Sequence, residues 1–211
     1  PFNFSQTSSY DWISFLLMGV VLVYGVLHYQ KQLNLKSLLS FAVSSEINED
    51  NMPSFSSRML LTANSLFVVS LLALQIISLY SEYEYFDQIF YLQIVFTLLI
   101  LVGIQMIFLR LYSFLTDTVS FFQEYLTAHS YYIHIASLLC LPLLIIGFYV
   151  PNVKQVFILA SAVLFALIYF IGILKTIGIS GRIKGAFRIH IILYLCGNEI
   201  LPLLLLYKLL I

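Results

Sequence analysis

Six long apolar runs constrain this chain more than any other feature of its sequence. Each run has about 20 or more mostly apolar residues, enough for a helix to cross a bilayer. Their expected ranges are 11–29, 60–81, 88–115, 130–150, 153–175 and 188–210. Only 9% of the 211 residues are charged, against roughly 25% in soluble domains, so a soluble fold could not cover this apolar surface. The sequence therefore predicts an all-α polytopic membrane helix bundle that forms a single domain over residues 1–211.

Two connections are long enough to hold further helices. In residues 31–44, Leu35, Leu38 and Leu39 fall on one helical face, which predicts an interfacial helix on the inner leaflet. Residues 112–129 combine aromatic side chains with two acidic residues, a composition compatible with a second surface-lying helix.

The distribution of Lys and Arg predicts the orientation of the bundle. If the spans alternate in direction, eight cations lie on one side of the membrane: Lys31, Lys36, Arg58, Arg110, Lys175, Arg182, Lys184 and Arg188. The other side keeps Lys154 and Lys208. Since cytoplasmic loops carry the excess of Lys and Arg, we expect the N-terminus and the C-terminus on the outer side.

Several functional classes are disfavoured by composition. A formal net charge of zero gives no basic field for nucleic acid. Cys140 and Cys196 lie in apolar runs and are expected to pack as small hydrophobic residues. The four histidines lack metal-ligand spacing, and no nucleophile stands in a recognisable catalytic motif. We therefore expect no catalytic residues, no metal and no cofactor.

The most unusual polar feature is the stretch CGNEILP inside the last apolar run. Glu199 lies eleven residues beyond Arg188, roughly 16 Å along a helix, which is near mid-membrane. A carboxylate there must be protonated, paired or exposed to water. Two roles stay open from the sequence: Glu199 carries a proton or coordinates an ion, or it joins helices as a neutral or paired group.

Three neighbours of Glu199 shape this intramembrane polar site. Pro202 lacks an N–H group, so it leaves the Asn198 carbonyl free for another partner. Gly197 allows another backbone to approach closely. Together these residues predict a kinked, tightly packed point in the helix, with Glu199 on the protein-facing side.

Other polar residues inside the spans suggest contacts with lipid or between helices. Arg110, His134, Arg188 and His190 lie toward the predicted inner ends of their spans and form an inner basic group. They are expected either to reach phosphates individually or to form a pocket for an anionic lipid head group. The isolated amides Asn64, Gln75, Gln93 and Gln105 predict interhelical hydrogen bonds.

The closing segment FRIHIILYLCGNEILPLLLLYKLL resembles the C-terminal end of Bacteroidota membrane proteins grouped as domain of unknown function 4271. The likeness rests on Tyr194, Cys196, Glu199, Ile200, Leu201 and Pro202. The stretch QEYLTAHSYYIHIASLLCLPLLII is also similar, with its aromatic-rich entry and Leu-Pro pair. The resemblance implies a bacterial inner membrane. In that membrane, the distribution of Lys and Arg predicts both termini on the periplasmic side. The resemblance implies no reaction.

These observations favour a non-enzymatic integral subunit or scaffold of a cell-envelope complex, such as secretion or gliding machinery. Its expected partners are the lipid bilayer and other membrane-protein subunits, without nucleic acid. A proton- or ion-coupled transporter or channel that uses Glu199 is the first alternative. A lipid-binding membrane protein that uses the inner basic group is the second.

Overall fold

The computed structural model describes residues 11–30, 55–80, 88–115 and 119–180, and it shows only helices there. They are α1 (Asp11–Tyr29), α3 (Phe55–Tyr80), α4 (Gln88–Leu115), α5 (Val119–Tyr149) and α6 (Lys154–Ser180), with a 3-10 turn, η3, at Pro151–Val153. Each of the five α-helices is long and apolar enough to cross a membrane. The predicted fold class, a helical bundle of membrane-spanning length, is confirmed in this part of the chain.

α1 and α4 have the same bounds as the apolar runs at 11–29 and 88–115, whereas α3, α5 and α6 each extend beyond their runs at one end. In the structure α5 begins at Val119, whereas the sequence predicted a span that begins at residue 130. Residues 119–129, expected in a separate surface helix, are the first turns of α5 instead. No Gly or Pro interrupts them, so nothing in this stretch ends a helix. The interfacial helix at 31–44 and the sixth span at 188–210 fall outside the described residues and stay predictions.

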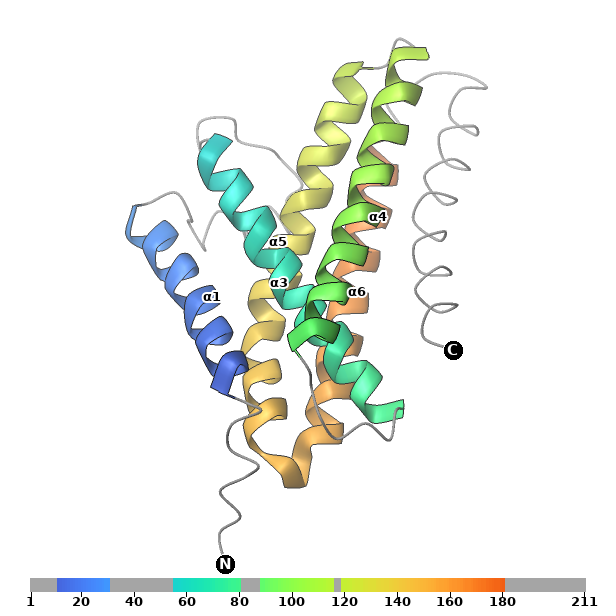
Figure 1. Cartoon of the computed structure of the whole chain (residues 1–211). Coiled ribbons are helices and arrows are strands. Elements are labelled where there is room, and N and C mark those ends of the chain that lie inside the picture. The colour runs from blue at the N-terminus through green and yellow to red at the C-terminus, as the bar shows by residue number, and fades with distance from the viewer. Residues whose placement is uncertain (1–10, 31–54, 81–87, 116–118, 181–211) are drawn as a thin grey trace, which may run out of the picture.

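Successive helices of the bundle run in opposite directions (Figure 1). α1, α4 and α6 point one way, and α3 and α5 point the other. α5 and α6 form a hairpin closed by η3. α3 lies at the centre, because it packs against α1, α4, α5 and α6.

One stripe of α3 forms much of the core. Its buried positions Ser57, Leu61, Asn64, Val68, Leu71 and Gln75 alternate at spacings of four and three residues. This is the heptad spacing that keeps one side of a helix facing its neighbours. The central helix therefore buries polar and small residues along with leucine and valine.

The hairpin of α5 and α6 is tightly packed. A Cβ atom at Gly172 of α6 would lie only 2.7 Å from the Cγ atom of Tyr132 on α5. The Cys140 thiol donates a hydrogen bond to the Ser161 carbonyl, 3.3 Å away. Glycine is required at position 172, because any side chain there would strike the Tyr132 ring.

Described cations gather toward one end of the bundle. Arg58 is in the first turn of α3, Arg110 is near the end of α4 and Lys175 is near the end of α6. The alternating helix directions bring these three positions to the same end, and Lys154 lies at the other (Figure 1). We call the end of the bundle that carries Arg58, Arg110 and Lys175 the basic end.

Candidate functional site

Only part of the site predicted from the sequence falls within the described residues. Gly197, Asn198, Glu199 and Pro202 lie outside them, as do Arg188 and His190. Of the inner basic group, Arg110 and His134 are described. Arg110 is exposed on α4, whereas His134 is buried on α5.

His134 is held inside the bundle by a hydrogen bond between helices. Its side chain is 5% exposed, and its Nδ1 atom lies 2.7 Å from the Oγ atom of Ser65 on α3. Ser65 is itself 1% exposed. The tautomer of the imidazole decides which of the two groups donates. A titratable side chain thus sits at an interface between two spans and away from the surface.

Two further polar side chains extend this contact to α1. The Nδ2 atom of Asn64 donates to the Val20 carbonyl on α1, at 3.2 Å. The buried Tyr24 hydroxyl, also on α1, lies close to the side chains of Asn64 and Ser65. It makes no hydrogen bond of normal geometry with another described residue. Tyr24, Asn64, Ser65 and His134 together form what we call the polar cluster, which joins α1, α3 and α5.

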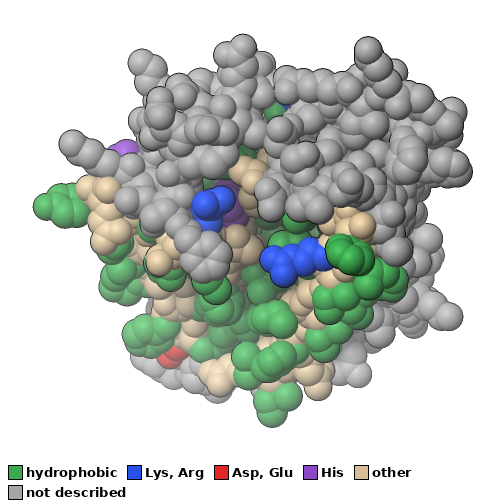
Figure 2. All heavy atoms as spheres, turned by 90° about the horizontal axis from the view of Figure 1, so that it is seen from above, with side chains coloured by type: hydrophobic (Ala, Val, Ile, Leu, Met, Phe, Trp, Pro, Cys, Tyr) green, Lys and Arg blue, Asp and Glu red, His purple; other side chains and the backbone are tan. Residues whose placement is uncertain are grey.

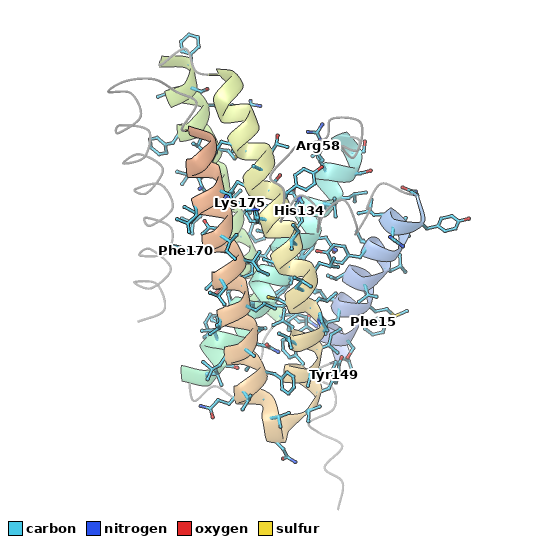
Figure 3. The ribbon with its side chains drawn as sticks, turned by 180° about the vertical axis from the view of Figure 1, so that it is seen from behind. Phe15, Arg58, His134, Tyr149, Phe170 and Lys175 are labelled. Atoms are coloured by element: carbon cyan, nitrogen blue, oxygen red, sulfur yellow. The ribbon has the colours of Figure 1, made fainter. Side chains whose placement is uncertain are left out.

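Two cations of the basic end, Arg58 and Lys175, lie toward the polar cluster (Figure 3). Arg58 is two helical turns before Ser65 on α3 and lies near Tyr131, which is one turn before His134 on α5. In the view of Figure 3, Arg58 and Lys175 lie on helices to either side of His134. Seen from the basic end, Lys and Arg side chains lie near the centre of the described surface, close to a histidine (Figure 2).

The amides predicted to join helices do so on α3. Asn64 bonds to α1, and the Nε2 atom of Gln75 donates to the Leu144 carbonyl of α5 at 3.1 Å. Gly147 of α5 leaves room for this amide, since a Cβ atom there would lie 3.3 Å from Nε2. On α4, by contrast, Gln93 is exposed and Gln105 is half-buried.

Sequence reasoning missed Ser65 as the partner of His134. Serine is frequent in the spans and carries no periodic signal of its own. The heptad stripe of α3 was the available signal, because it places Asn64 and the adjacent Ser65 on the buried side. Within the described ranges, no group of three or more His, Cys, Asp or Glu side chains could hold a metal ion.

Comparison with known proteins gives one result. Neither the curated proteins nor the solved structures include a match to this chain. The family model described as domain of unknown function (DUF4271) matches residues 12–210, which is nearly the whole sequence. The match includes all the described helices and the CGNEILP stretch. The chain therefore belongs to the DUF4271 family.

Proposed function

We propose that this protein is a non-enzymatic integral subunit, or scaffold, of a cell-envelope complex in a bacterial inner membrane. The observation that carries the proposal is the use of buried polar side chains. In the described spans several of them, including Asn64, Ser65 and Gln75, make hydrogen bonds between helices. Polar side chains that bond to neighbouring helices stabilise the arrangement of the spans, which is the role of a structural element.

The contacts between helices are distributed along the bundle. They are Asn64 with Val20, Ser65 with His134, Ser70 with Tyr91, Gln75 with Leu144, Cys140 with Ser161, and Ser14 with Tyr149. Such hydrogen bonds each contribute about 0.6 kcal/mol on average in a membrane. Together they favour one arrangement of the spans.

The outward faces of the bundle suit lipid or the spans of partner subunits. Large apolar side chains are exposed along α1, α4 and α6, among them Phe15, Ile107 and Phe170. Helix association in lipid depends on packing and hydrogen bonds, since lipid tails are as apolar as leucine. Faces of this kind can therefore accept a partner helix in place of lipid.

The proposed orientation places the basic end in the cytoplasm and both termini on the periplasmic side. Arg58, Arg110 and Lys175 support it, because short cytoplasmic connections carry the excess of Lys and Arg.

Purification from the source membrane in a mild detergent tests the scaffold role. We expect other membrane proteins to co-purify in a fixed ratio, identified by mass spectrometry. Photo-crosslinking residues at the outward Phe170 and the buried Leu144 make a matched pair. Position 170 should crosslink to a second protein, and position 144 should crosslink only within the chain. A chain that purifies alone, as a monomer or homo-oligomer, contradicts the proposal.

A proton- or ion-coupled transporter or channel that uses Glu199 is the second candidate. The buried position of His134 favours it, because it supplies a further titratable group inside the spans. In proteoliposomes, a proton gradient should then drive a flux that Glu199→Gln abolishes while assembly is kept. Equal fluxes in the two proteins would remove this candidate.

A further inference from the structure

α1 packs into the core through the buried residues Ile13, Leu17, Val20, Tyr24 and Leu27, and polar and aromatic contacts accompany this packing. Near its start, Ser14 bonds to Tyr149, and the Trp12 ring lies 5.1 Å from the ring of Tyr91. Further along, the Asn64 amide holds the Val20 carbonyl. The part of α1 nearest the basic end is therefore held on its polar side by the polar cluster.

His134 is connected to this attachment of α1 through its hydrogen bond to Ser65. Ser65, its hydrogen-bond partner, is adjacent in sequence to Asn64, and both side chains lie close to the Tyr24 hydroxyl. A change in the donors of His134 therefore reaches α1 through one serine.

We propose that His134 is a proton-binding site whose occupancy controls how firmly the polar cluster holds α1. A hydronium ion transfers its proton to the neutral imidazole and leaves as water, and the reverse transfer restores the neutral ring. This role requires neither proton transport nor Glu199, and it does not depend on the scaffold function proposed above.

Protonation changes the hydrogen bond between His134 and Ser65. In the neutral ring one nitrogen accepts and the other donates, so Ser65 can donate to Nδ1. In the protonated ring both nitrogens donate, and Ser65 can only accept from Nδ1. The Ser65 hydroxyl must then turn toward another acceptor. The Tyr24 hydroxyl of α1 lies close to Ser65 and to the Asn64 side chain, so it is a candidate acceptor.

Protonation also places a charge where the described surroundings do not neutralise it. The titratable or charged groups near His134 among the described residues include Tyr24 on α1, Arg58 on α3, Tyr131 on α5 itself and Lys175 on α6 (Figure 3). None of these is a carboxylate, and two are cations. A charge buried among helices is costly unless it is paired or hydrated. A charged imidazole is favoured where it can be hydrated, so we expect acid to favour the state in which the polar cluster no longer holds α1.

The single tryptophan of the chain reports on α1. Because Trp12 is the only Trp and contacts Tyr91 of α4, its fluorescence changes when α1 shifts. We would follow it with the full chain in nanodiscs between about pH 8 and about pH 3.5, which extends below the range in which an exposed histidine titrates, because a charge buried among helices is costly. We expect the emission maximum to move to longer wavelength as the pH falls, and quenching by acrylamide to increase.

The test compares two histidine variants. His134→Gln should remove the pH-dependent shift, because glutamine keeps hydrogen-bonding groups but does not titrate. His129→Gln is the matched control on the same helix. His129 stacks against Tyr125 and meets the edge of Tyr169, so the shift should persist there. A shift that survives in His134→Gln, or a native chain that shows none, overturns the proposal.

Asn64→Ala gives an independent test if His134→Gln does not yield a folded bundle. It keeps all four histidines and removes the bond to Val20. We expect Trp12 emission at pH 8 to move toward its acidic value, and the remaining shift to be smaller. A full, unchanged shift in this variant overturns the link between the polar cluster and α1.

Discussion

α3 and α4 are successive apolar helices of similar length, yet the bundle uses them in opposite ways. In the membrane-spanning part of α3, 50% of the residues are buried inside the bundle. In the corresponding part of α4, only 11% are buried. α3 carries two side-chain amides, and α4 carries three. Those of α3 bond to α1 and α5, and those of α4 are exposed or half-buried.

The difference lies in the size and spacing of residues, since apolar content is high in both helices. α3 places serines and an asparagine on its buried stripe, and small or hydrogen-bonding side chains let helices approach in lipid. α4 carries bulky side chains all round, with Phe96, Ile100 and Phe108 exposed. In a membrane such a helix gains little from being enclosed, because lipid solvates it equally well.

The largest expected effect separates Leu71 of α3 from Leu99 of α4. Leu71 is fully buried, and Leu99 is 52% exposed. Leu71→Ala should lower the free energy of unfolding by about 2 kcal/mol, the low end for buried leucines, because lipid or detergent solvates the unfolded side chain. Leu99→Ala should change it by less than about 0.5 kcal/mol. Equilibrium unfolding in mixed micelles measures both. Equal losses would show that α4 is enclosed by protein.

The next effect is a difference in sign between two glycines. A methyl group at Gly103 of α4 meets nothing within 4 Å, so Gly103→Ala should stabilise the bundle by about 0.5–1 kcal/mol through helix propensity. At Gly147 of α5 the same methyl group lies 3.3 Å from the Gln75 amide. There the gain in propensity is offset by displacement of Gln75, so Gly147→Ala should be neutral or destabilising. Thermal unfolding of both variants in one detergent checks the sign, and stabilisation by both would mean that Gln75 moves freely.

The comparison of α3 with α4 also shows what sequence can predict. The existence and approximate bounds of the described spans follow from length and apolar content, because a bilayer imposes both. The start of α5 was misplaced by eleven residues, since polar and aromatic residues at 119–129 resemble a surface segment while still propagating the helix. A bilayer constrains the apolar part of a helix and not its extension beyond that part.

The site was harder to predict than the fold, because it depends on which faces meet. His134 was assigned to the inner basic group by its position along the chain, and the structure gives it a buried partner on α3. The hydrogen bond between His134 and Ser65 joins residues 69 positions apart, and no sequence pattern connects the two positions. Asn64 and Gln75 were correctly predicted to bond between helices. The same rule also predicted bonds for Gln93 and Gln105, and the described contacts include none for either side chain. The sequence shows that an amide lies within a span, but it does not show which face of the helix carries it.

The smallest and most specific effect compares two glutamines. Gln75→Leu removes the hydrogen bond to the Leu144 carbonyl, and bonds of this kind contribute about 0.6 kcal/mol on average in a membrane. It also removes a buried Oε1 atom that has no partner among the described residues, which reduces the loss. We expect a net destabilisation of about 0.5 kcal/mol or less. Gln93→Leu exchanges an exposed amide for an apolar side chain at a lipid-facing position, so it should be neutral or slightly stabilising. Paired unfolding curves resolve the sign. A larger loss of stability in Gln93→Leu than in Gln75→Leu would mean that the Gln93 amide bonds to a partner helix. In that case α4 would be enclosed by protein, and the contrast between a buried α3 and an exposed α4 would be wrong.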